Sequence, residues 1–283
     1  MADGAADVCV CVLFYGTDDA CFELAQRVLN APMLQLAQQN VEFRFGFNDV
    51  GERTRAFVQE TVASSLPGAL VLDYGENIFK YPMMRRMFHE RPLRAPLTMW
   101  FDDDSCLAPD NNPAVWLPRV QKLMETYTMI GSLYRQRLVG QQAQWIQNQW
   151  WYNGKPPGTY VKFCTGGWWT IRTEALLRFD WPPPELRHRG GDVMLGALCE
   201  QHNLALAHFR DGVWINANAQ GVESKSPRRG HNEKPIGFDY RTAAEPLSRE
   251  ALLAAGCCCG NGCVNCPYTP AHERGATRIN PAL

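Results

Sequence analysis

Three adjacent aspartates, Asp102, Asp103 and Asp104, follow the apolar pair Trp100-Phe101. Neighbouring carboxylates repel one another unless a cation neutralises them. Carboxylate oxygens suit Mg²⁺ or Mn²⁺, the ions that hold diphosphate groups in many proteins. Alternate side chains of an extended segment point the same way, so Asp102 and Asp104 are expected to share one ion. The alternative is a solvated acidic turn.

A fourth acid, Asp192, follows Gly190 and Gly191 and begins an apolar, helical segment. An aspartate at such a place usually caps the helix. However, two glycines let the backbone approach a ligand closely. A carboxylate held beside that ligand can take a proton from a hydroxyl group as a general base. The sequence therefore offers two interpretations of Asp192, a helix cap and a catalytic base.

Alternating strands and helices must position these acids. The first half predicts strands at residues 8–15, 41–47, 69–73 and 96–101, with helices at 18–29, 51–63 and 78–89 between them. This alternation predicts an α/β fold with a mostly parallel sheet. Ligands gather at the carboxyl ends of such strands. The polar groups expected at this edge are Tyr15-Gly16, Asn48-Asp49 and Asp102 to Asp104.

The second half is less regular. It predicts helices at residues 113–138, 141–151 and 191–203, a strand pair at 161–172 bent at Gly166-Gly167, and strand-like structure at 204–215. A polar segment at 216–237 is expected to be a loop, because it is rich in Gly, Pro and Ser. A short helix is expected after residue 240.

Taken together, these features resemble the family 2 glycosyltransferases, which have the GT-A fold, over residues 8–215. The resemblance rests on the order of six segments: Tyr15-Gly16-Thr17, Asn48-Asp49, Asn77 to Lys80 with Arg85 and Arg86, the DxD position at Asp102 and Asp104, the Gly-Gly segment at 165–176, and Gly191-Asp192. The family has an acid where this chain has Gly191, so a supporting carboxylate is missing.

The resemblance implies a metal-dependent, inverting transfer of a sugar from a nucleotide-diphosphate sugar, a UDP-sugar first of all, to an acceptor hydroxyl. Asp192 would be the base. The donor would be bound by Tyr15, Gly16, Asn48, Asp49, Lys80, Arg86, Asp102 and Asp103. The acceptor would be bound by Gly166, Gly167, Trp168 and Trp169. Mn²⁺ or Mg²⁺ would be held by Asp102, Asp104 and a later histidine, His231, with His208 more suited to a packed core. For Lys80 and Arg86 the alternative is a solvated helix face.

Nine tryptophans are many for 283 residues, and five of them fall between residues 145 and 169. Indole rings stack on sugar rings and on bases. We expect Trp168 and Trp169, beside the glycine pair, to be exposed for this purpose. For any single tryptophan, packing in the core is the alternative.

Five of the eleven cysteines crowd into residues 257–266. An odd total with such clustering is unlike a secreted disulfide framework, and it favours reduced thiols. Four thiolates at this density suit Zn²⁺ or an iron–sulfur cluster, so Cys258, Cys259, Cys263 and Cys266 are candidate ligands. The run resembles short motifs of small uncharacterised and oxidoreductase-like proteins. A vicinal disulfide or free thiols are the alternatives.

These segments predict a GT-A-like domain over residues 1–240, with a nucleotide-sugar half at 1–110 and an acceptor half at 111–240, and a Cys-rich appendage at 241–283. A net charge of -1 and a pI near 6.6 argue against attraction of the whole surface to nucleic acid or anionic membrane. No stretch approaches the ~20 apolar residues that span a bilayer. A cytoplasmic protein is expected.

Four functions remain open. The first is transfer to a carbohydrate or lipid-linked acceptor. The second is transfer to a hydroxymethylated base in DNA, helped by the basic segment that holds Lys225, Arg228, Arg229 and Lys234. The third is a nucleotidyltransferase, which the acidic run Gly16-Thr17-Asp18-Asp19 disfavours. The fourth is a non-catalytic nucleotide-sugar-binding module, in which Asp192 is only a cap.

Overall fold

The fold is built on a mixed, mostly parallel sheet. The computed structural model describes residues 6–138, 140–188, 190–215, 249–254, 256–258, 266–270, 273 and 275–280. Seven strands lie in the order β3-β2-β1-β4-β7-β6-β8 in this part of the chain. Their bounds are β1 Val8–Gly16, β2 Val41–Val50, β3 Leu70–Asp73, β4 Leu97–Phe101, β6 Met129–Arg137, β7 Tyr160–Arg172 and β8 Leu206–His208. Only β7 runs antiparallel to its neighbours, β4 and β6. The expected α/β class is confirmed.

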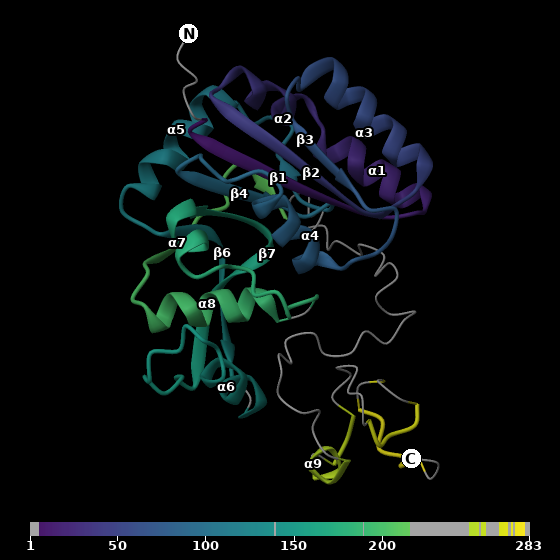
Figure 1. Cartoon of the computed structure of the whole chain (residues 1–283), viewed down its shortest axis with the longest axis vertical. Coiled ribbons are helices and arrows are strands. Elements are labelled where there is room, and N and C mark those ends of the chain that lie inside the picture. Colours follow the sequence, from purple (N-terminus) through teal and green to yellow (C-terminus); the bar gives the residue numbers. More distant parts are fainter. Residues whose placement is uncertain are drawn as a thin grey trace.

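Helices cover the sheet (Figure 1). Their bounds are α1 Asp19–Val28, α2 Ala31–Gln35, the short 3₁₀ helix η1 Leu36–Gln38, α3 Glu52–Ser65, α4 Lys80–His89, α5 Pro113–Met124, α6 Gly140–Gln147, α7 Thr173–Arg178, α8 Gly191–Gln201 and α9 Arg249–Leu253. Two short strands, β5 Cys106–Leu107 and β9 Val213–Trp214, form a separate antiparallel pair. No helix among the described residues is long and apolar enough to cross a bilayer.

Strand β1 lies in the middle of the core. Cys9, Cys11 and Leu13 face one apolar cluster, which also contains side chains of α4 and α8. Val10 and Val12 face a second cluster, together with side chains of α1, α3 and α5. Burial on both faces explains why this segment reads as a continuous apolar run rather than an alternating one. The sheet thereby holds its carboxyl edge rigidly, and the candidate site is built on that edge.

The expectation of one helix over residues 113–138 is wrong in its second half. Helix α5 ends at Met124, and the chain turns into strand β6. This strand lies between β7 and β8, and it buries Met129 in one apolar cluster and Ile130 in the other. Burial on both sides of the sheet outweighs the weak local preference for helix. Residues 160–172 likewise form one strand, β7, rather than a pair.

Candidate active site

An ion pair joins the beginning of α4 to the end of β4. Lys80 is the first residue of α4, and its Nζ lies 2.6 Å from Oδ2 of Asp102. Their side chains are only 12% and 21% exposed. A partly buried pair is screened less by salt than a surface pair. Two residues that the sequence assigned to donor binding are therefore brought together at the carboxyl edge of the sheet.

Both carboxylate oxygens of Asp102 accept hydrogen bonds. The second oxygen, Oδ1, accepts from the indole Nε1 of Trp100 at 2.8 Å. Trp100 and Asp102 are two residues apart on an extended segment, so their side chains point the same way. Sequence reasoning missed Trp100, although this spacing was a usable signal.

The glycine pair of β7 also contacts this ion pair. The carbonyl oxygen of Gly166 accepts from Lys80 Nζ at 3.0 Å, and that of Gly167 accepts from the backbone N–H of Asp102 at 2.8 Å. A Cβ on residue 166 would lie 2.7 Å from Lys80 Nζ. The sequence assigned both glycines to the acceptor side, whereas their carbonyl groups hold the Lys80–Asp102 pair.

Asp192 lies in the first turn of α8, next to the same charges. The N-cap is Gly190, with φ at 81°, so the interpretation of Asp192 as the cap is wrong. Asp192 Oδ1 instead accepts from the backbone N–H of Val193 at 3.0 Å. Burial raises the pKa of Asp192, while the charge of Lys80 opposes that shift. A carboxyl group with a raised pKa is a common feature of general bases.

Tyr81 interacts electrostatically with both acids. Its side chain is buried, and its backbone N–H donates to the carbonyl of Arg187 at 2.9 Å. Burial, followed by the charges of Asp192 and Asp102, raises the pKa of its phenol well above the ordinary value. The phenol therefore stays protonated and can donate a hydrogen bond. Nothing in the sequence pattern singled out Tyr81.

A network of amides fixes the start of α4. Asn48 is 3% exposed, and its Oδ1 accepts from the backbone N–H of Ile78 at 2.8 Å. Its Nδ2 donates to Oδ1 of Asn77 at 2.9 Å, and Asn77 Nδ2 lies 3.4 Å from the Tyr15 hydroxyl. Tyr15 and Asn48 are direct partners on β1 and β2. Asn48 thus orients the segment that leads into Lys80.

Asp49, Gly16 and Arg86 were also expected to bind the donor. Asp49 is exposed with φ at 56°, and Gly16, with φ at 101°, accepts at its carbonyl from Gly51. Arg86 is exposed, and its guanidinium lies 5.5 Å from the ring centre of Tyr74. The structure does not bring Arg86 to the Lys80–Asp102 pair.

The far end of α4 is anchored by two arginines. Arg44 is fully buried, and its guanidinium donates to the carbonyl oxygens of Met87, Arg91 and Pro92. Cations at the end of a helix satisfy its unpaired carbonyl groups. Arg85 contacts both carboxylate oxygens of Asp180 at 2.9 and 3.0 Å. These anchors fix the axis of the helix that presents Lys80.

Solved structures with an overall likeness to this chain include glycosyltransferases of the GT-A fold. The likeness is distant. The mannosyltransferase PcManGT from Pyrobaculum calidifontis, in complex with GDP-Man and Mn²⁺, has a TM-score of 0.48 at 12% identity, over 74% of this chain and 56% of that chain. Mouse xyloside xylosyltransferase 1 has a TM-score of 0.42 at 12% identity, over 72% and 85%.

A nucleoside-diphosphate-sugar pyrophosphorylase from Vibrio cholerae RC9 has a TM-score of 0.44 at 11% identity, over 73% of this chain and 94% of that chain. No protein-family model and no curated protein matches the sequence. This chain spans little more than half of the mannosyltransferase, 56%. At these identities and TM-scores, no activity is carried over to this chain from the solved structures.

The tryptophans beside the glycine pair are buried, and the expectation that they are exposed is wrong. Trp168 is 0% exposed and packs against Phe101, with ring centres 6.4 Å apart. Trp169 is 3% exposed and stacks on Trp100 at 6.0 Å. Neither ring presents a face to a sugar in this arrangement. Trp150, 64% exposed, is the tryptophan whose ring is open to solvent.

The acids fit a divalent ion only in part. Asp102 already accepts one hydrogen bond on each oxygen, from Lys80 and from Trp100, and the ammonium offsets its charge, so a metal ion would have to share this carboxylate. Asp103 and Asp104 are half-buried beside it, and the hydroxyl of Ser105 lies 3.4 Å from Asp104 Oδ1. Among the described residues, no three His, Cys, Asp or Glu side chains gather as metal ligands. His231 lies outside the described residues, as do Lys225, Arg228, Arg229 and Lys234.

The cysteine-rich tail is described only in part. The Sγ atoms of Cys258 and Cys266 lie 3.6 Å apart, and both side chains are buried with Leu252 and Tyr268. Cys259 and Cys263 lie outside the described residues. Two of the four expected ligands therefore lie close together, and a zinc or iron–sulfur site stays a prediction.

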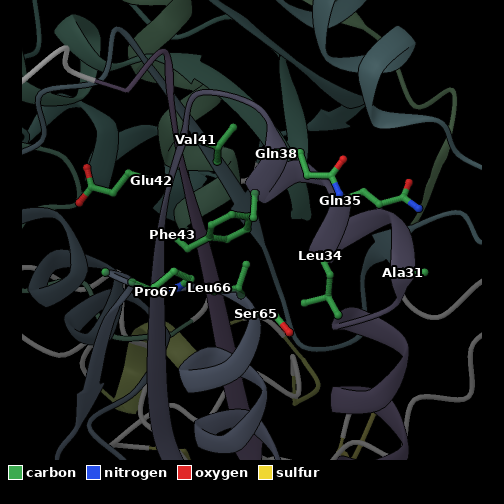
Figure 2. A pocket seen from close by; sticks show the side chains of 13 residues that line it. Ala31, Leu34, Gln35, Gln38, Val41, Glu42, Phe43, Ser65, Leu66 and Pro67 are labelled. Carbon is green, nitrogen blue, oxygen red and sulfur yellow. The ribbon is translucent and has the colours of Figure 1, made fainter. Parts of the chain in front are cut away.

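A pocket of about 660 Å³ opens at the other end of the strands (Figure 2). Its lining includes Val41 and Phe43, at the start of β2, and Leu66, which follows α3. The candidate site uses Asn48, near the end of the same strand β2. In Figure 2 the carboxylate of Glu42 points away from Leu66. The pocket is therefore separate from the candidate site.

Proposed function

We propose that this protein transfers a sugar from a nucleotide-diphosphate sugar to an acceptor hydroxyl, with Asp192 as the general base. One observation carries the proposal. The charge of the Lys80–Asp102 pair acts on the half-buried Asp192, and the phenol of Tyr81 interacts with both acids. A cation to hold phosphate beside an acid with a raised pKa is the pair of groups that such a transfer needs.

On the donor side, Lys80 supplies positive charge where a diphosphate leaves. Its ammonium is fixed by Asp102 and by the carbonyl of Gly166, at 2.6 and 3.0 Å, before any ligand arrives. A preorganised charge stabilises a leaving group without paying for reorganisation during the reaction. The anchors of α4, Arg44 and Arg85, keep that charge in place.

On the acceptor side, Asp192 removes the hydroxyl proton as the oxygen attacks the anomeric carbon, and the bond from that carbon to the diphosphate breaks. Direct attack from the opposite face of the sugar inverts the anomeric configuration. The raised pKa of Asp192, caused first by burial, makes its carboxylate a stronger base than a solvated aspartate. The charge of Lys80 opposes that rise in pKa, because it favours the carboxylate.

Metal dependence remains a prediction centred on Asp104, since Asp102 is already paired with Lys80. The charges used in the steps above are those of Lys80, Asp102 and Asp192. A dependence on Mn²⁺ would place an additional cation near Asp104, and alanine at that position would remove the dependence.

A panel of nucleotide sugars tests the proposal. Each candidate donor is added to the purified full chain, with and without Mn²⁺, and the melting temperature and the release of nucleoside diphosphate are measured. We expect at least one donor to raise the melting temperature, as any ligand that binds only the folded state must. We also expect the same donor to be hydrolysed slowly or transferred. A protein stabilised by donors that it never turns over would instead be a binding module.

A further inference from the structure

Part of β6 and part of β7 form a two-stranded ribbon. Residues 133–137 of β6 pair with residues 160–164 of β7 and with no other strand of the described chain. The neighbouring strands pair elsewhere: β4 pairs with residues 168–172, and β8 pairs with residues 129–131. In Figure 1 this ribbon runs past α8 toward α6. The ribbon therefore extends beyond the main body of the sheet.

The two faces of the ribbon differ along β7, whereas residues 134–137 of β6 are exposed on both faces. Val161 and Phe163 are 1% and 7% exposed. Phe163 lies against α8, because a Cβ added to Gly196 of that helix would lie 2.6 Å from the Cβ of Phe163. Cross-strand partners share a face of a sheet. The opposite face therefore carries the direct partners Arg135 and Lys162, together with the partners Arg137 and Tyr160. All four side chains are exposed.

We name these four residues, Arg135, Arg137, Tyr160 and Lys162, the ribbon patch. Arg135 and Lys162 are like charges directly opposite one another, an arrangement that weakens a sheet. Among the ion pairs of the described residues, none involves the three cations of the patch. The guanidinium of Arg135 lies 4.4 Å from the ring centre of Tyr160. The patch thus concentrates charge that the fold itself does not use.

We propose that the ribbon patch binds the phosphate backbone of a nucleic acid. Three cations on one face supply the phosphate contacts, and the exposed ring of Tyr160, 45% exposed, offers a surface on which a base can stack. A two-stranded ribbon is also one of the shapes that the major groove of a duplex admits. Because the net charge of the chain is only -1, the attraction for phosphate groups is confined to the patch.

The patch lies on the strand that leads into the candidate site. Lys162 precedes Gly166 by four residues on β7, which is roughly 13 Å along a strand. The patch therefore lies within the span of a short oligonucleotide from the carbonyl group that holds Lys80. Resting on the proposed function, the inference names the acceptor as a hydroxyl group carried by a nucleic acid.

Fluorescence anisotropy tests binding without any sugar donor. Labelled duplex and single-stranded oligonucleotides of one sequence are titrated with the full chain between 50 and 200 mM salt. Three phosphate contacts predict a slope of log K against log salt of about -2.7 for the duplex and about -2.1 for the single strand. The duplex affinity should therefore fall roughly 40-fold over that range.

The decisive variant is R135Q/K162Q, which removes two cations and keeps two long polar side chains. We expect its slope to become shallower by roughly 1.8 for the duplex, with at least a tenfold loss of affinity at 50 mM salt. The matched control is R119Q/K122Q, which removes two exposed cations that pair with Asp211 and Glu125. The control should bind like the wild type. Melting temperatures check that both variants fold.

Three results would overturn the inference: no binding at 50 mM salt, an unchanged salt slope in R135Q/K162Q, or equal binding to an acidic polysaccharide or to phosphatidylserine vesicles. The unchanged slope would place any binding elsewhere on the chain. Because the titration contains no donor, it separates the two proposals. Intact nucleic-acid binding without any sugar transfer would count against the proposed function and leave the ribbon patch standing.

Discussion

The ring of Tyr81 occupies the space that a side chain on residue 191 would need. A Cβ on Gly191 would lie 2.1 Å from Tyr81 Cζ and 2.3 Å from its hydroxyl oxygen. The glycine before Asp192 is therefore required by the tyrosine packed against it. Burial raises the pKa of this phenol well above its ordinary value. Asp192 is backed by a neutral group and keeps its own raised pKa.

Gly191→Ala should destabilise the protein by about 1–3 kcal/mol, the usual cost of forcing extra atoms into a packed site. It should also displace Tyr81 and lower turnover. The control is Gly140→Ala at the start of α6, where a Cβ would meet nothing within 4 Å. Thermal unfolding of the two variants provides the comparison. Equal stability of both would show that Tyr81 does not press on Gly191.

Lys80→Met keeps most of the side-chain stem and removes the ammonium. We expect the affinity for a nucleoside diphosphate to fall by about 10- to 100-fold, since hydrogen bonds to charged groups contribute about 1.5–3 kcal/mol. The uncompensated carboxylate of Asp102 would add repulsion. Arg86→Met is the control, because Arg86 lies over Tyr74 and away from the pair. Calorimetry measures both, and a larger loss in Arg86→Met would contradict this description of the donor site.

Trp168→Ala should cost about 3–5 kcal/mol of stability, the usual range for a buried tryptophan. Trp150→Ala removes a ring that is 64% exposed and should leave the fold intact. Denaturant unfolding followed by circular dichroism compares the two. A stable Trp168→Ala protein with weakened acceptor binding would instead indicate that the ring of Trp168 stacks on the acceptor.

The sequence was sufficient for those parts of the fold that follow local patterns. Strand β1 could be read from its continuous apolar run, and helix α1 from Asp18, whose side chain accepts from the backbone N–H of Cys21. Strand β6 could not, because its position is fixed by pairing with β7 and β8, far away in the sequence. The same limit applied to Trp168 and Trp169, whose burial depends on neighbours from β4 and α5.

The sequence predicted which charged residues form the site better than it predicted their contacts. Lys80, Asp102 and Asp192 could be selected because they are charged groups at predicted element ends. Apart from the indole of Trp100, two residues from Asp102, their partners come from distant segments, and the sequence places no constraint on those contacts. The role of Asn48 changed for the same reason: its amide is used by Ile78 and Asn77.

The pH dependence of stability should reveal Asp192. Its pKa is raised in the folded protein, so between its ordinary value and the raised value the folded state binds more protons than the unfolded state. The contribution of this group to stability therefore falls as the pH rises through that window and is constant above it. The melting temperature of Asp192→Asn minus that of the wild type should increase with pH and then level off. A difference that is flat from acid to neutral pH would contradict the raised pKa.

Turnover of Asp192→Asn tests whether Asp192 is the base. The substitution preserves shape, leaves the Gly190 cap in place, and removes a half-buried charge, so the melting temperature at neutral pH should not fall. Donor affinity should survive, because Lys80 and Asp102 are untouched. Transfer should fall by about 10²-fold or more, the usual scale for loss of general base catalysis. Near-wild-type transfer by a folded, donor-binding Asp192→Asn protein would contradict the account.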